Sequence, residues 1–219
     1  MTTVEDMNVE DMNYEFRTAR REDTEGIEAL DGSFTTHTVF HVSVTGAGSA
    51  GSPTATTETT GSTGSTGSTV GTVFALREVP VDPPIRKIFP LDDTDDEGDS
   101  APEDNPNLRT VVAIDANECL AGYVVVSFDS WNRRLTIVDV TVAPAHRGRG
   151  VGRTLMGHAA EFARERGATH IWLEVTNINA PAIHAYQRMG FTFCGLDTTL
   201  YDGTPSAGEQ ALYMSMPCL

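Results

Sequence analysis

Three glycines alternate with arginines and a valine in one short stretch, and this stretch most restricts what the chain can fold into. Residues 147–153 read R-G-R-G-V-G-R and follow a strand-like run that ends at Pro144. Glycine has no Cβ, so a glycine-rich turn that opens a helix lets backbone N–H groups approach an anion closely. We therefore predict a strand–turn–helix unit that binds a phosphate or pyrophosphate. Its candidate binding residues are Arg147, Gly148, Arg149, Gly150, Val151, Gly152 and Arg153.

Two common phosphate-binding patterns do not fit this stretch. A P-loop needs a lysine after its last glycine, and the only lysine of the chain is Lys87. A dinucleotide fingerprint needs G-x-G-x-x-G after a parallel strand, whereas this chain has G-x-G-x-G after strands that we expect to be antiparallel. The remaining alternative is a tight turn with solvent-exposed arginines.

Acidic residues outnumber basic residues by 31 to 15, which gives a net charge of −16. Such a chain lacks the cations that replace counterions on nucleic acids or bind anionic lipids, so neither partner is expected. We interpret the charge as that of a halophilic protein, which its acidic surface keeps soluble at high salt. The alternative is a surface that attracts a cationic substrate.

The termini and cysteines indicate a cytoplasmic protein. The acidic N-terminus lacks the basic and then apolar pattern of a signal peptide. No apolar run reaches the length of about 18–20 residues that a membrane span needs. Cys119, Cys194 and Cys218 form no C-x-x-C pair, so we expect neither a disulfide framework nor a bound metal.

Low-complexity segments divide the chain. Residues 1–11 form an acidic repeat and predict a disordered leader, and residues 12–219 predict one domain. Within it, residues 45–71 consist almost entirely of Gly, Ser, Thr and Ala, and residues 92–107 are acidic with prolines. Neither stretch buries enough apolar surface to offset the entropy of ordering, so we expect two flexible inserts.

Hydrophobic periodicity predicts strands and helices in a defined order. We expect strands at 14–17, 37–44, 73–79, 108–114, 120–128, 135–142, 170–175, 191–194 and 211–216, and helices at 22–30, 151–166 and 180–189. Pro83 and Pro84 are expected to end the third strand, and strands 108–142 to form an antiparallel meander. Along 135–142, alternation places Val138, Val140 and Val142 on one face and Leu135, Ile137, Asp139 and Thr141 on the other.

A second motif follows the glycine-rich turn. It reads N-x-x-A-x-x-x-Y-x-x-x-G-F from Asn179 to Phe191. Together with V-D-V-T-V-A-P before R-G-x-G-x-G, it resembles the acetyl-CoA signature of the GNAT acetyltransferase superfamily over residues 108–216. The resemblance implies an α/β (α+β) fold with a central mixed, mostly antiparallel sheet flanked by helices. It also implies acetyl-CoA as co-substrate, with Asn179 holding the pantetheine chain or capping the helix.

A narrower resemblance concerns the C-terminal part. The stretches L-E-V-T-N-I-N-A-P-A-I-H-A-Y and D-T-T-L-Y at 197–201, with Glu209 before the last strand, are similar to the streptothricin acetyltransferase branch. This likeness favours a small cationic amine as acceptor. The two inserts and the scarcity of lysine depart from that branch.

Amine acetylation by a thioester needs a base, a polarised carbonyl and an acid for the leaving thiolate. By resemblance to N-terminal acetyltransferases, Glu174 is the candidate base, with a structural acceptor as the alternative. Asp139 is the second candidate, with a polar pair inside the sheet as its alternative. Tyr186 is the candidate acid, and backbone N–H groups at Val140 and Val142 would polarise the carbonyl.

We therefore predict an acetyl-CoA-dependent N-acetyltransferase that transfers directly to a primary amine. Its acceptor would be a small molecule of the streptothricin type. The alternatives are a protein or peptide N-terminal or lysine acetyltransferase, with a peptide amine as acceptor, and a non-catalytic sensor of acyl-CoA. The sequence leaves open whether the chain is a monomer or a homodimer.

Overall fold

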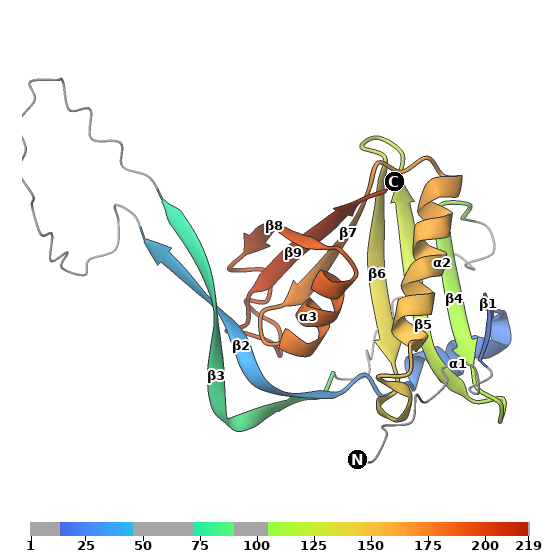
Figure 1. The fold of residues 1–219 in the computed structure, drawn as a ribbon, viewed down its shortest axis with the longest axis horizontal. Coiled ribbons are helices and arrows are strands. Elements are labelled where there is room, and N and C mark those ends of the chain that lie inside the picture. Colours follow the sequence, from blue (N-terminus) through green and yellow to red (C-terminus); the bar gives the residue numbers. More distant parts are fainter. Residues whose placement is uncertain (1–13, 46–71, 90–104, 219) are drawn as a thin grey trace, which may run out of the picture.

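The computed structural model describes residues 14–45, 72–89 and 105–218 (Figure 1). The expected leader at 1–11 and nearly all of the expected inserts at 45–71 and 92–107 lie outside the described residues. Within the described ranges, no helix has the length and apolar character that crossing a membrane requires.

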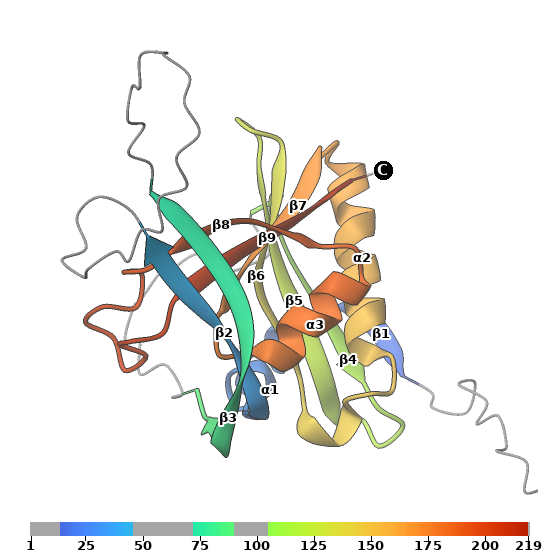
Figure 2. The same ribbon diagram turned by 60° about the vertical axis from the view of Figure 1, so that its left-hand side comes forward.

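Seven strands form one sheet in the order β1-β4-β5-β6-β7-β9-β8, and β2 and β3 form a separate two-stranded ribbon (Figures 1 and 2). Only β6 and β7 pair in parallel among the described strands. The expected mixed, mostly antiparallel sheet with flanking helices is confirmed. The elements are β1 (Glu15–Thr18), a 3-10 turn (Arg21–Asp23), α1 (Thr24–Glu28), β2 (Phe34–Thr45), β3 (Val73–Lys87), β4 (Leu108–Ile114), β5 (Leu120–Asp129), β6 (Arg134–Val142), a second 3-10 turn (Pro144–His146), α2 (Val151–Glu165), β7 (His170–Thr176), α3 (Ala180–Arg188), β8 (Thr192–Asp197) and β9 (Ala211–Pro217).

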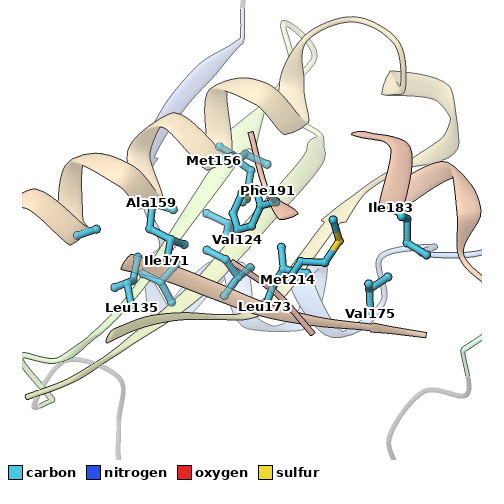
Figure 3. Packing of buried hydrophobic residues seen from close by; sticks show 14 of the residues in the cluster. Val124, Leu135, Met156, Ala159, Ile171, Leu173, Val175, Ile183, Phe191 and Met214 are labelled. Atoms are coloured by element: carbon cyan, nitrogen blue, oxygen red, sulfur yellow. The ribbon is translucent and has the colours of Figure 1, made fainter. Parts of the chain in front are cut away.

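Helix α2 lies across β4, β5 and β6 and buries the stripe that the sequence predicts (Figure 1). Side chains of both α2 and α3 enter one core. Met156 of α2 and Ile183 of α3 lie in the same cluster as Leu173, Val175 and Met214 of the strands (Figure 3). Each fully buried aliphatic side chain contributes about 1.5–3 kcal/mol of transfer free energy, so this cluster holds the two helices on the sheet. The predicted stripe of Val151, Leu155, Ala159 and Phe162 is buried, together with Met156 and Ala163.

A β-bulge interrupts β6. The adjacent β5 residues Val125 and Val126 pair with Asp139 and Ile137, so Val138 is an extra residue without a cross-strand partner on β5. The side chain of Val138 is correspondingly exposed. A single extra residue reverses which face each later side chain occupies.

The bulge makes the predicted division of this strand wrong. Strict alternation separates Leu135 and Ile137 from Val140, but all three lie with the hydrophobic core. Asp139 and Thr141 therefore stand on the opposite face, away from the apolar residues with which the sequence grouped them. The core side of β6 consists of Leu135, Ile137, Val140 and Val142.

The bulge also limits the contact between β6 and β7. Their parallel pairing runs only from Arg134 with His170 to Ile137 with Leu173. Beyond that point β6 continues to Val142 paired with β5, while β7 continues paired with β9. The two strands diverge, and the sheet is split between them (Figure 1). Alternate backbone groups of each strand face this split.

The expected end of the third strand and the expected length of the first helix were both wrong. Pro83 and Pro84 do not end the third strand, because β3 continues to Lys87. They fall where the ribbon register jumps: Thr36 pairs with Ile85 and Thr38 with Pro80. Proline is tolerated there because these positions make no ladder hydrogen bond.

The expected helix at 22–30 is shorter and begins as a 3-10 turn. Asp23 accepts hydrogen bonds from both terminal nitrogens of Arg17, at 2.7 and 2.9 Å, and from the backbone N–H of Arg20. This bidentate ion pair lowers the pKa of the Asp23 carboxyl and fixes the tight turn in front of α1.

Strands β5 and β6 stay paired along their length, and their backbones lie close together at Gly122 of β5. A Cβ at Gly122 would lie 2.7 Å from the Thr141 carbonyl oxygen, whereas one at Gly157 of α2 would meet nothing within 4 Å. We expect Gly122→Ala to lower the free energy of unfolding by about 1–3 kcal/mol. Gly157→Ala, the matched control, should raise it by about 0.5–1 kcal/mol. Urea unfolding of both variants checks this, and equal stabilities would contradict it.

Candidate active site

The glycine-rich turn has the conformation that its sequence predicts. Gly148 and Gly150 have φ angles of +74° and +85°, which residues with a side chain rarely adopt. A Cβ at either position would meet no atom within 4 Å, so the outer side of the turn is open. Gly150 is the N-cap of the 15-residue helix α2. The N–H groups in the first turn of α2 have no carbonyl acceptor within the helix, and they lie next to this open glycine-rich segment.

The candidate binding residues of the glycine-rich turn differ in which of their groups can contact a ligand. Arg147 is already engaged, because it donates from Nε to the Val142 carbonyl at 2.8 Å and from Nη1 to the Ser33 carbonyl at 2.7 Å. Its guanidinium thus ties the turn to β6 and to the chain before β2. Val151 is buried, so only its backbone can face a ligand. Arg153 is exposed on the first turn of α2.

Glu174 lies on β7 on the face opposite the core. Its neighbours Leu173 and Val175 point into the core, and Glu174 alternates with them. Tyr201 donates a hydrogen bond from its hydroxyl to Glu174 Oε1 at 2.5 Å. Burial raises the pKa of the Glu174 carboxyl, the Tyr201 hydrogen bond opposes the rise, and the negative charge of Glu209 adds to it.

Tyr186 lies on α3 near the split between β6 and β7. Its ring packs against Phe191, with 5.8 Å between ring centroids. Burial raises the pKa of the Tyr186 hydroxyl, and the charges of Asp139 and Glu174 raise it further. Among the described residues, no hydrogen-bond partner contacts this hydroxyl. Side chains from β6, β7 and α3 thus converge where the strand pairing has ended.

Asp139 is paired inside the sheet, as one of its two interpretations expects. The hydroxyl of Tyr123 on β5 donates to Asp139 Oδ2 at 2.5 Å. Burial and this hydrogen bond raise the pKa of Tyr123. The pairing exists because the bulge turns Asp139 to the face that Tyr123 occupies. The sequence analysis did not single out Tyr123, since an alternating strand pattern does not identify cross-strand partners.

Helix α3 begins as its sequence predicts. The Asn179 side chain accepts a hydrogen bond from the Ala182 N–H at 3.3 Å, and Pro181 lies in the first turn. Gly190, with a φ of +102°, follows the last turn. The cap is confirmed, and it fixes the start of the helix that carries Tyr186. Val140 and Val142, the candidate backbone donors, follow the bulge on β6.

Sequence reasoning gave no role to a second group of residues near Glu174. Tyr201 and Glu209 lie in the segment between β8 and β9, and Glu209 is bonded to Lys87 and Thr176. The only indication was the D-T-T-L-Y stretch and Glu209, which were noted for their likeness to a family branch. In the described part of the chain, no three His, Cys, Asp or Glu side chains are grouped as a metal ion would need.

Comparison with known proteins identifies relatives that cover nearly the whole chain. A streptothricin acetyltransferase of Streptomyces lavendulae is 58% identical over 205 residues, which cover 94% of this chain and 95% of that protein. The crystal structure of a nourseothricin acetyltransferase superposes with a TM-score of 0.74 at 57% identity, covering 94% of this chain and 99% of that one. A protein of Bacillus anthracis str. Ames, solved with acetyl coenzyme A, shares the fold at 21% identity and a TM-score of 0.64, covering 94% of this chain and 98% of that one.

The family profile matches the part of the chain that contains both motifs. The profile described as acetyltransferase (GNAT) family aligns with residues 77–191. These residues include the glycine-rich turn, the split between β6 and β7, and the helix that carries Tyr186. The chain belongs to the GNAT family of acetyltransferases.

Proposed function

We propose that this protein is an acetyl-CoA-dependent N-acetyltransferase whose acceptor is a primary amine of a small, cationic, streptothricin-like compound. The observation that carries the proposal is the position of Glu174 and Tyr186 beside the split between β6 and β7. Family membership and the Streptomyces lavendulae relative support it.

The residues of the glycine-rich turn fit the diphosphate of coenzyme A. The turn leaves room for close backbone approach at Gly148 and Gly150, and Arg153 supplies an exposed cation beside them. The N-terminus of α2 adds its partial positive charge. The β6 backbone after the bulge would hold the pantetheine chain, and its free N–H groups would polarise the thioester carbonyl. Acetyl-CoA supplies the activated acetyl group.

Glu174 and Tyr186 would move the two protons that the transfer requires. Glu174 accepts the proton of the acceptor ammonium, directly or through water, because burial gives its carboxylate a greater proton affinity than an exposed glutamate has. Its Oε2 makes no hydrogen bond with any described residue. Tyr186 keeps its proton at neutral pH, because its pKa is raised. It would give this proton to the departing thiolate as the amine nitrogen bonds to the acetyl carbon and the C–S bond breaks. The second proton of that nitrogen would restore the tyrosine hydroxyl, so that the products are the amide, the free thiol of coenzyme A and one proton on Glu174.

The charges on the open face favour a cationic acceptor. Asp139 and Glu174 contribute carboxylates there, and the chain as a whole carries −16. Opposite charge raises the local concentration of a cationic substrate and its rate of association. A peptide N-terminus or a lysine side chain would satisfy the same chemistry less specifically, and both belong in the acceptor panel.

Thiol release from acetyl-CoA with a panel of amines tests the function. We expect turnover with streptothricin and weaker or no turnover with spermidine, lysine and N-terminal peptides. Tyr186→Phe and Glu174→Gln should each lower kcat about 10²–10⁴-fold, the usual range for general acid–base groups. Glu161→Gln, on the surface of α2, is the matched control and should leave kcat unchanged. Tight acetyl-CoA binding without turnover on any amine would favour an acyl-CoA sensor.

Removal of an exposed cation beside the turn should affect only binding of the acetyl donor. We expect Arg153→Ala to raise the KM for acetyl-CoA about 10- to 100-fold, because one charge-assisted hydrogen bond contributes about 1.5–3 kcal/mol. The value of kcat should stay constant. Arg164→Ala, in the last turn of the same helix, is the control. Equal KM changes in both variants would mean that Arg153 acts only through net charge.

A buried base with a raised pKa should oppose folding at neutral pH. The folded protein binds the Glu174 proton more tightly than the unfolded chain does, so the resulting stability is present at low pH. It is lost as the pH rises through the folded-state pKa. We expect Glu174→Gln to raise Tm at pH 7–8 relative to the original chain, and to have no such effect near pH 4. A Tm difference that does not change with pH would contradict this.

A further inference from the structure

The segment between β8 and β9 supplies the hydrogen-bond donor of Glu174. Residues 198–210 cross from one strand to the other through successive turns, without a helix or strand of their own. Within it the Asp202 N–H donates to the Thr199 carbonyl, and the Thr204 N–H to the Tyr201 carbonyl, at 2.9 and 3.0 Å. Such a segment needs contacts with the rest of the fold to hold one conformation. The Tyr201 hydroxyl stays on Glu174 only if these contacts persist.

One of these contacts is an ion pair at the far end of the segment. Lys87 Nζ donates to Glu209 Oε1 and, at 2.8 Å, to Ser206 Oγ. Thr176 of β7 donates from its hydroxyl to Glu209 Oε2 at 2.5 Å. The Lys87 and Glu209 side chains are each only 14% exposed. Both oxygens of Glu209 are therefore bonded, and solvent screens this pair less than a surface pair.

Lys87 comes from a distant part of the chain. It is the last residue of β3, in the ribbon that lies outside the main sheet, and it is the only lysine among 219 residues. Without its ammonium, the part-buried Glu209 carboxylate would lose its counter-charge. Removal of one partner of a buried pair is strongly unfavourable, because the remaining charge is left uncompensated.

We propose that Lys87 is a positioning residue for the base: its ion pair with Glu209 fastens residues 198–210 to the ribbon and thereby holds the Tyr201 hydroxyl on the Glu174 carboxylate. This inference rests on the proposed function of Glu174. It assigns the β2–β3 ribbon a part in catalysis through a residue that does not touch the reacting atoms.

Several charged and titratable groups surround Glu174 and determine what the test can read. Besides Tyr201 and Glu209 from the 198–210 segment, Tyr213 of β9 pairs with it across the strands. Asp139 of β6 and Tyr186 of α3 lie across the split. None of these groups changes its identity when Lys87 is replaced. A shift in the behaviour of Glu174 then reports on the Lys87 contacts.

The pH profile of Lys87→Met distinguishes positioning from a purely structural role. Glu174 acts as the carboxylate, so kcat/KM falls as pH drops through its pKa. Loss of Lys87 leaves the Glu209 charge uncompensated and frees Tyr201, and both changes disfavour the ionised carboxyl. We expect the acidic limb of the profile to move to higher pH and kcat to fall about 10- to 100-fold, the scale of a small misplacement. An unmoved limb would overturn the proposal.

Further variants control for misfolding and test whether Lys87 acts on Glu174 through Tyr201. Lys87→Arg preserves the charge and should keep the limb near its original position. Arg86→Met removes the neighbouring exposed cation of β3 and is the matched control. Because Lys87 acts through Tyr201, Lys87→Met and Tyr201→Phe should lower kcat by less in combination than the product of their separate effects. Independent, multiplicative effects would overturn the proposed route.

A direct titration separates this inference from the proposed function. Carbon-13 NMR of glutamate-labelled protein, with the Glu174 signal assigned through Glu174→Gln, follows this carboxyl without any turnover. We expect a higher midpoint in Lys87→Met than in the original chain. If the original chain turns over no amine, the proposed function fails while the coupling is still measured. If the midpoints coincide, the coupling fails whatever the activity.

Discussion

The extra residue in β6 is the constraint on which the rest of the structure depends. With Val138 inserted, β6 bends away after Ile137, and a parallel pair of only four residues is left to join the two halves of the sheet. The halves stay together because α2 and α3 contribute to one core that spans them (Figure 3). The opening that would receive the acetyl donor is thus a consequence of sheet geometry. The packing of α2 and α3 on the sheet compensates for the hydrogen bonds that β6 and β7 do not form with each other.

The split between β6 and β7 also determines where the two carboxylates of the site lie. Asp139 and Glu174 stand on opposite sides of the opening, on a face that the core does not cover. Each carboxylate receives one phenol hydroxyl, from Tyr123 and Tyr201 respectively. Glu174 is part-buried, and the hydrogen bond from Tyr201 to its ionised form offsets part of the cost of that burial. Tyr186, which bonds to neither carboxylate, keeps its hydroxyl available.

The sequence predicted those features that depend only on residues close together in the chain. The apolar stripe of α2, the positive-φ glycines and the Asn179 cap all follow from periodicity and backbone freedom, and the structure confirms them. The bulge did not follow, because V-D-V-T-V alternates whether or not one residue is extra. Tyr201 and Glu174 are 27 residues apart, and Lys87 and Glu209 are 122 apart. Pairings at such separations are set by topology, which the pattern does not encode.

The near absence of lysine has a chemical consequence for a chain that would acetylate amines. An arginine guanidinium stays protonated in proteins, so the fourteen arginines offer no free nitrogen lone pair to a thioester. The single lysine is part-buried, and its ammonium donates hydrogen bonds to Glu209 and Ser206. No side chain therefore presents a free amine that would compete with the acceptor. The one side-chain amine is instead engaged in the contact that joins the β2–β3 ribbon to residues 198–210.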